Sequence, residues 1–180
     1  GRNLDVYVTD MERIEVLRGP QGTLFGQNST GGGINVVTKA PTFDDFYGSA
    51  DLTVGEFSLV KARAALNIPI SESLGARISV QSNKHDGFSD NVSNGQDLDD
   101  ADSFSARAKI LYNANDTFSA TFTAQIFDEE VNGQAQKGLY DPTPGARKLA
   151  QDSLSSYELE SQLYSMTLEW DLGGFSLKSA

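Results

Sequence analysis

The glycines are the residues that most strongly suggest a chemical site, because six of them fall between residues 19 and 33. A glycine-rich connection after a short apolar strand is typical of a loop that cradles phosphate groups. Such a loop also needs a Lys followed by Ser or Thr, and the N-terminus of a helix. Here the glycines run into the apolar stretch "INVVT" at 34–38, without a "GKS" or "GKT" sequence. The pattern therefore argues against nucleotide binding.

Other motifs that could carry chemistry are also incomplete. His85 is the only histidine and cysteine is absent, so neither a His-dependent triad nor a His- or Cys-based zinc site can be assembled. The acidic run "DLDDAD" at 97–102 has Asp102 where a calcium loop requires glycine, and Ala108 where it requires glutamate. We interpret it as a solvated loop, with weak divalent-ion binding as the alternative. The segment "GQNSTG" lacks the G-x-S-x-G order of a nucleophile elbow. We expect no enzyme, no catalytic or metal-binding residue and no cofactor.

The charge balance excludes another class of protein. The 180 residues carry 14 Lys and Arg against 25 Asp and Glu, a net charge of -11. Nucleic-acid binding requires a basic surface, and no Lys/Arg cluster supplies one. No apolar run approaches the roughly 20 residues of a membrane-spanning helix. Because the chain begins at Gly1 and ends inside an expected strand, we expect it to be a fragment of a longer protein.

Polar and apolar residues alternate through most of the chain beyond Phe46. The alternation predicts strands at 46–54, 60–68, 76–81, 103–113, 117–127 and 164–172. In the clearest of them, Phe118, Phe122 and Ile126 share a face, and Thr117, Thr121 and other polar residues share the opposite face. A period of two over such lengths predicts strands with one apolar and one polar face, and it does not fit helices.

The expected connections differ in length in an ordered way. The second, fourth and sixth are short, whereas the third and fifth are long and polar, at 86–102 and 129–156. The first, at 55–58, is a tight exception. Because consecutive antiparallel strands alternate in direction, all the short turns fall at one end of the sheet. This asymmetry is typical of an outer-membrane barrel, with short periplasmic turns and long extracellular loops.

Aromatic residues gather near both ends of the expected strands. Those near the short turns are Tyr112, Phe118, Trp170 and Phe175, and those near the long loops are Phe57, Phe88, Phe104 and Phe127. Two such girdles are expected at the two interfaces of a membrane. A soluble antiparallel sandwich would also alternate, but its strands are shorter, with about 5–6 residues against about 9–11 in a membrane strand.

The segment "MERIEVLRGPQGTLFGQNSTGGGINVVTKAP" at 11–41 gives the glycines another role, because it resembles the end of the plug domain of TonB-dependent outer-membrane receptors. The resemblance implies an all-β transmembrane barrel, of which the chain holds about six to seven antiparallel strands. The strands are preceded by the C-terminal part of a small α+β plug domain. We place the plug at 1–41 and the first barrel strands at 42–180. Glycines would then supply the sharp turns of a chain packed inside the barrel lumen.

The resemblance also suggests residues for two roles. Phe25 falls where many relatives carry Tyr, in a plug loop that rises toward the ligand. We expect Phe25, Gln27, Asn28 and Ser29 to contact ligand, or Phe25 to be a packing anchor.

Arg18 is expected to pair with a barrel carboxylate, or with Glu12 or Glu15 within the plug. Five basic residues share the expected lumen face, namely Lys61, Arg63, Arg77, Arg107 and Lys109. We interpret them as a solvated, hydrogen-bonded wall, with plug docking or guidance of an anionic ligand as the alternative.

The function implied by the resemblance is TonB-dependent uptake of a scarce ligand across the outer membrane of a Gram-negative bacterium. By the family's prevalence the ligand would be a ferric siderophore, with cobalamin, carbohydrate or another nutrient as alternatives. The expected partners are TonB, through the plug's N-terminal segment, and outer-membrane lipid and lipopolysaccharide. A soluble β-rich carbohydrate-binding module remains the alternative from another class.

Overall fold

The computed structural model of the chain describes residues 9–19 and 32–179. The chain divides into two compact units, residues 1–40 and residues 41–180, and each is described by itself. Every regular element among the described residues is a β-strand. No helix in this part of the chain is long and apolar enough to cross a membrane.

The described part of the first unit is a two-stranded antiparallel sheet. It consists of β1 (Met11–Arg18) and β2 (Gly32–Thr38), with Val16 opposite Ile34 and Arg18 opposite Gly32. Asp10 precedes β1 in a left-handed conformation with φ of 56°, and its carbonyl accepts a hydrogen bond from Lys39 N at 3.0 Å. Helix, which an α+β plug would contain, is not found among the described residues of this unit.

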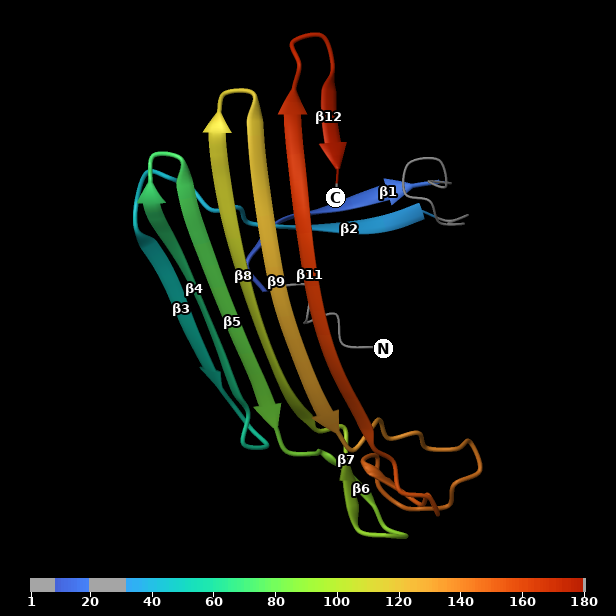
Figure 1. The fold of residues 1–180 in the computed structure, drawn as a ribbon. Helices are drawn as coiled ribbons and strands as arrows, with labels where there is room; N and C mark the ends of the chain where they lie inside the picture. Colours follow the sequence, from blue (N-terminus) through green and yellow to red (C-terminus); the bar gives the residue numbers. More distant parts are fainter. Residues whose placement is uncertain (1–8, 20–31, 180) are drawn as a thin grey trace. The chain divides into compact units, whose positions relative to one another are not determined.

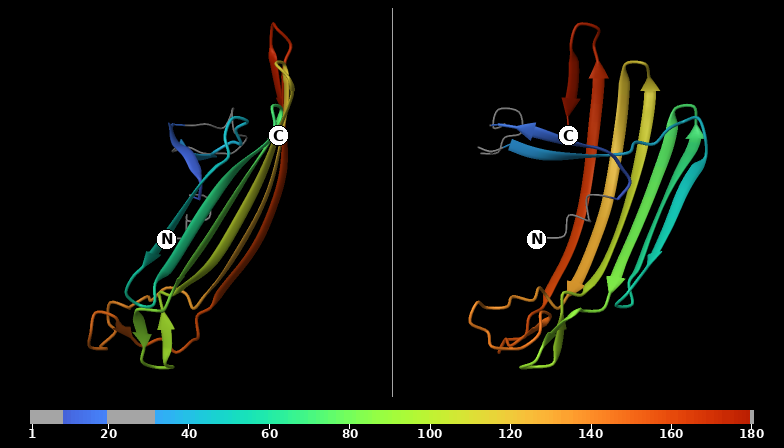
Figure 2. Two further views of the ribbon diagram at one scale, coloured as in Figure 1. Left: turned by 90° about the vertical axis from the view of Figure 1, so that its left-hand side faces the viewer. Right: turned by 180° about the vertical axis from the view of Figure 1, so that it is seen from behind.

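The second unit is built on one seven-stranded sheet with the order β12-β11-β9-β8-β5-β4-β3 (Figure 1). Its strands are β3 (Tyr47–Val54), β4 (Val60–Ser71), β5 (Leu74–His85), β8 (Ala101–Asn115), β9 (Phe118–Val131), β11 (Tyr157–Asp171) and β12 (Ser176–Ser179). Every neighbouring pair is antiparallel. The sheet does not close, and seen edge-on it is a single curved layer (Figure 2). This confirms the prediction of a partial barrel with six to seven strands.

The two faces of this sheet differ in chemistry, as the alternation predicted. Residues paired directly across neighbouring strands lie on the same face, so the register defines the members of each face. The apolar face comprises Ala50, Leu52, Ala62, Ala64, Leu66, Ile78, Val80, Phe104, Ala106, Ala108, Ile110, Phe122, Ala124, Ile126, Tyr164, Met166 and Trp170. The polar face comprises Lys61, Arg63, Asn67, Arg77, Ser79, Gln81, Asn83, Ser103, Ser105, Arg107, Lys109, Thr121, Thr123 and Gln125.

On the central strands β5 and β8, exposure of the two faces is the reverse of that in a soluble sheet. On β5, Ile78 and Val80 are 42% and 36% exposed, whereas Arg77 and Ser79 are each only 4% exposed. Antiparallel sheets of soluble proteins bury the apolar face and solvate the polar one. A membrane barrel turns its apolar face to lipid and its polar face to the interior, and the curved sheet has this arrangement.

The connections separate into short turns at one end of the sheet and longer segments at the other (Figure 1). The short turns are 72–73, 116–117 and 172–175. Asn115 stabilises the second of these, because its Oδ1 accepts hydrogen bonds from Thr117 N and Phe118 N, both at 2.9 Å. At the other end lie 55–59, 86–100 and 132–156. The predicted asymmetry, including the tight first connection, is confirmed.

The aromatic girdles are correct in part. Phe118 and Trp170 contact each other edge to face, with ring centroids 6.0 Å apart, near the short turns. Phe104 lies on the apolar face and is 44% exposed. Phe127 was expected in the same girdle, but it is 6% exposed and opposite Ser105 on the polar face. The prediction for Phe127 was wrong because it considered only how far along the strand the residue lies. Successive residues of a strand point to opposite faces, and Phe127 points to the polar one.

The two long connections contain strands of their own. They are β6 (Ser89–Asn91), β7 (Gln96–Leu98) and β10 (Lys148–Leu149), which form a three-stranded sheet with the order β10-β6-β7. Leu98 of β7 and Leu149 of β10 are 0% and 2% exposed, so this small sheet buries apolar side chains of its own. We call this assembly of 86–100 and 132–156 the loop lobe. The sequence analysis predicted only irregular loops here.

Candidate functional site

The four residues expected to contact ligand, Phe25, Gln27, Asn28 and Ser29, lie outside the described residues. Their role remains a prediction. The described residues include the ionic residues of β1, the polar face of the sheet and the loop lobe.

The carboxylates near the predicted plug arginine are bound by a different residue. Arg13 Nη1 lies 2.6 Å from Glu12 Oε1, and Arg13 Nε lies 2.7 Å from Glu15 Oε1. Asn35 Nδ2 of β2 donates to Glu15 Oε2 at 2.9 Å. The hydrogen bond from Asn35, together with that from Arg13, lowers the pKa of Glu15 below its usual value. The partner of Arg18, either a barrel carboxylate or Glu12 or Glu15 within the plug, remains a prediction.

The five basic residues predicted to share one face do so. Arg63 pairs with Asp51 of β3, with a distance of 2.8 Å from Nη2 to Oδ1. Arg107 Nε donates to Gln125 Oε1 at 2.9 Å, and Arg77 lies over the ring of Tyr47, 5.5 Å from its centroid. Arg77 and Arg107 are 4% and 9% exposed. These contacts favour the interpretation as a hydrogen-bonded wall.

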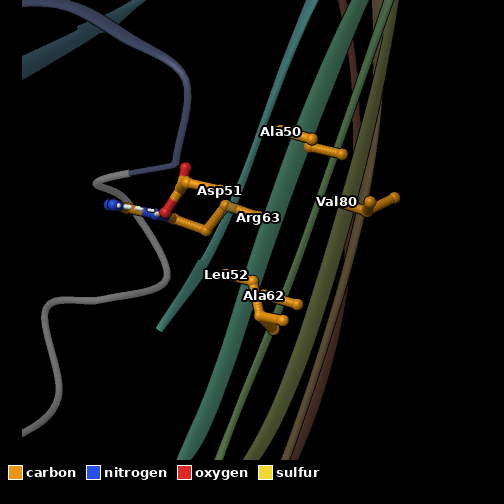
Figure 3. Close-up of a pocket in the computed structure, with 7 residues that line it drawn as sticks. Ala50, Asp51, Leu52, Ala62, Arg63 and Val80 are labelled. Atoms are coloured by element: carbon orange, nitrogen blue, oxygen red, sulfur yellow. Dashed lines mark hydrogen bonds and ion pairs between the residues drawn. The ribbon is translucent and has the colours of Figure 1, made fainter. Parts of the chain in front are cut away.

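A shallow hollow lies over β3, β4 and β5, and Figure 3 shows how its lining side chains point. Ala50, Ala62 and Val80 point to one side of the sheet, and the ion-paired Asp51 and Arg63 point to the other. Five of the seven lining residues are apolar, and the two charged ones point away from the others, so the hollow offers few polar groups to orient a ligand. We interpret it as unevenness of the apolar face.

Asn67 is a buried polar residue that sequence analysis missed. It is 0% exposed and binds the segment that precedes β3. Its Oδ1 accepts from Thr42 N at 2.9 Å, and its Nδ2 donates to Asp45 O at 2.8 Å and to Thr42 Oγ1 at 2.9 Å. The same segment approaches Gly75, where an added Cβ would lie 3.1 Å from Thr42 O. Residues 41–45 are therefore clamped to β4 and β5.

The acidic run at 97–102 has a structural role. Asp99 Oδ1 accepts from Ala135 N at 3.0 Å, and Asp100 Oδ1 accepts from Asn132 N at 2.8 Å. Asp102 pairs with Lys84 at 2.5 Å. Among the described residues, no group of three or more His, Cys, Asp or Glu side chains is arranged to hold a metal ion.

Asp141 organises the tip of the 132–156 connection, which predicts a pH-dependent loop. Hydrogen bonding by the side chain of Thr143 and by the backbone N–H groups of Ala150 and Thr143 lowers the pKa of Asp141 from its usual value to about 2. Because the pKa is lower in the folded loop, this stabilisation is complete above pH ~4 and is lost as the pH falls toward about 2. A spin label at Gly138 of the full-length protein should therefore become more mobile over this window.

The control for this prediction is Asp141→Asn, which removes the titrating group. Its label should be more mobile than the wild-type label at neutral pH, with no titration between pH ~4 and about 2. A wild-type label whose mobility does not change in that window would show that Asp141 does not hold the tip.

The chain is similar in sequence to known receptors. No family model matches. The chain is 25% identical over 181 aligned residues to the ferric enterobactin receptor PirA of Pseudomonas aeruginosa, covering 91% of this chain and 24% of that receptor. Over 34 residues it is 56% identical to the pesticin receptor of Yersinia enterocolitica, covering 19% of this chain and 5% of that receptor.

The fold was also compared with solved structures. The ferric yersiniabactin uptake receptor FyuA of Yersinia pestis matches with a TM-score of 0.74 and 25% identity, over 92% of this chain and 27% of that chain. The chain thus spans about a quarter of the length of FyuA and of PirA. Together with the motif at 11–41 and the partial barrel, these matches confirm that the chain resembles part of a TonB-dependent outer-membrane receptor.

Proposed function

We propose that the protein containing this chain is an outer-membrane receptor that takes up a ferric siderophore by a TonB-dependent mechanism. The observation that carries the proposal is the seven-stranded sheet, whose apolar face is largely exposed and whose polar face is buried on β5 and β8. The chain is similar to receptors whose names specify ferric enterobactin and ferric yersiniabactin. A soluble carbohydrate-binding module would have to solvate a face that carries Phe122, Met166 and Trp170, at considerable cost.

The two units would have different tasks in such a receptor. The sheet of the second unit would form part of the barrel wall, with the apolar face in contact with lipid and the polar face lining the lumen. The loop lobe would lie on the extracellular side, since long loops of outer-membrane barrels face the medium. The first unit would be the end of the plug, with Phe25, Gln27, Asn28 and Ser29 toward the ligand.

Transport would require the plug to move. Ligand would bind at the plug apex and the extracellular loops, and TonB would then pull on the plug's N-terminal segment and open a path to the periplasm. The buried polar face, with Arg77 and Arg107 held by hydrogen bonds and a ring contact, supports this view. A hydrogen-bonded wall can face water or a polar plug as the plug moves.

The experiment that tests this function is uptake of radioactive iron by the native bacterium and by a strain lacking the full-length gene. The iron is supplied with enterobactin or yersiniabactin, the ligands that the names of PirA and FyuA specify. Uptake with one of them should be lost in the deletion strain, restored by the gene, and abolished by a protonophore. If the deletion strain takes up iron normally but has lost uptake of cobalamin or carbohydrate, the ligand is that nutrient and not a siderophore.

A further inference from the structure

The two long connections at one end of the sheet are joined by backbone pairing. β10 lies parallel to β6, with Lys148 opposite Asp90 and Leu149 opposite Asn91. Asp90 N donates to the carbonyl of Arg147 at 2.8 Å. Two-residue pairing is weak by itself, since its few hydrogen bonds must offset the entropy of ordering a long loop. Other groups must therefore hold the connections together.

Two side-chain amides extend this pairing. Asn91 accepts a hydrogen bond from Gln151 N and donates one to Gln151 O, both at 3.0 Å. Gln96 accepts from Ser155 N at 3.0 Å and donates to the carbonyl of Ser155. A carboxamide offers the same donor and acceptor as a peptide group, so each side chain takes the place of a strand residue. Asn91 is 1% exposed, so its own amide has almost no access to water.

The beginning of the 132–156 connection is fixed as well. Asp99 N donates to Gly133 O at 2.9 Å, and the Asp99 carboxylate accepts from Ala135 N at 3.0 Å. Asp100 accepts from Asn132 N at 2.8 Å. The connection is therefore attached to residues 89–100 both where it leaves β9 and where it approaches β11.

The tight turn between β3 and β4 joins the same assembly. The guanidinium of Arg147 lies 5.3 Å from the ring centroid of Phe57 and 5.8 Å from that of Phe88. Phe57 and Ser58 both have φ of 56°, a strained conformation for residues with side chains. Asp86 stabilises this turn, because its N–H donates to Phe57 O at 2.7 Å and its carboxylate accepts from Ser58 Oγ.

From these contacts we propose that the connections 55–59, 86–100 and 132–156 move as one body, with Asn91 and Gln96 as positioning residues. The lobe holds out a tip with Leu139 and Tyr140, which are 90% and 93% exposed. The joint movement of the connections does not depend on the proposed function. Only its consequence for ligand entry rests on that function. In a receptor, an incoming ligand would meet a preformed wall, and closure of one of these connections independently of the others would be excluded.

The test measures the distance between two spin labels in the full-length protein without ligand, in lipid nanodiscs. The labels are placed at Ser93 and Gly138, one in each long connection, and residues 1–180 contain no cysteine that would compete for labelling. One narrow distance distribution is expected. Asn91→Asp and Gln96→Glu each keep the shape of the side chain but remove its N–H donor. Both should broaden the distribution and speed amide exchange in 147–155 about tenfold or more.

Gln136→Glu is the matched control, because it adds the same charge at an exposed position of the loop lobe, in the connection 132–156. Its distribution and exchange should equal those of the wild type. Gln96 is only half-buried, so its variant should keep the barrel intact even if Asn91→Asp impairs folding. A broad wild-type distribution, or a Gln96→Glu variant as narrow as the control, would overturn the proposal. Because no ligand is used, a failed uptake experiment would leave this result unaffected.

Discussion

Arginine in place of Ala124 should destabilise the full-length protein in a bilayer by about 2–4 kcal/mol, the cost of Arg at the midplane of the lipid-facing surface of a barrel. Ala124 lies in a row across the apolar face, with Ala108 of β8 on one side and Tyr164 of β11 on the other. Further apolar side chains flank this row toward both ends of the strands, including Ile126 and Phe122. A guanidinium there would have to lose its hydration or distort the lipid around it.

The matched control is Thr121→Arg, one strand position from Phe122 but on the polar face. Thr121 is opposite Leu111 and Thr167, so the new charge does not face another basic residue directly. We expect a change of less than about 1 kcal/mol, as for a surface substitution. Both free energies of unfolding are measured by denaturant titration in liposomes. If Thr121→Arg were the costly variant and Ala124→Arg neutral, the polar face would be the one in contact with lipid, and the proposed barrel would be wrong.

The seven-stranded sheet was predictable because its signals are local and repeated. Each strand alternates over many residues, and a shift of one position would move a whole apolar set to the opposite face. The turns are equally local, as Asn115 shows by accepting two hydrogen bonds from the next turn. Except for β3, the observed strands are longer than predicted, because pairing continues past the alternation into polar ends such as Asp128–Val131. Backbone hydrogen bonding does not require alternation there.

The loop lobe could not be predicted, because its strands have two or three residues each and show no periodicity. Its decisive contacts join Asn91 to Gln151 and Gln96 to Ser155, across about sixty residues of chain. Nothing in the sequence distinguishes these amides from the many other polar residues of the two connections.

Arg13 is a different case. It shares one side of β1 with Glu15, two positions along, so the alternation that defined the barrel faces was sufficient to suggest this pair.

Asn67→Leu should free residues 41–45 from the sheet. Leucine is close in size but leaves Thr42 N–H and Asp45 C=O without the partners that Asn67 provides. Each backbone group left unpaired in a buried site costs about 1–3 kcal/mol. Amide exchange of Thr42 should therefore become roughly 100-fold faster in the full-length protein, measured by hydrogen–deuterium exchange in nanodiscs. Gly75→Ala should act in the same direction, because its Cβ would lie 3.1 Å from Thr42 O and 3.3 Å from Pro41 Cβ.

The control is Asn113→Leu, the same substitution on β8 near the same end of the sheet, with exchange at Thr42 expected to match the wild type. The position of the Asn67 clamp gives this result a mechanical meaning, because the chain divides into its two units between Ala40 and Pro41. If TonB pulls on the first unit, the clamp keeps residues 41–45 attached to β4, and extension of the chain should stop before the barrel strands. If amide exchange of Thr42 is as slow in Asn67→Leu as in Asn113→Leu, the segment is held by other contacts. Asn67 would then not be the residue at which extension of the chain stops.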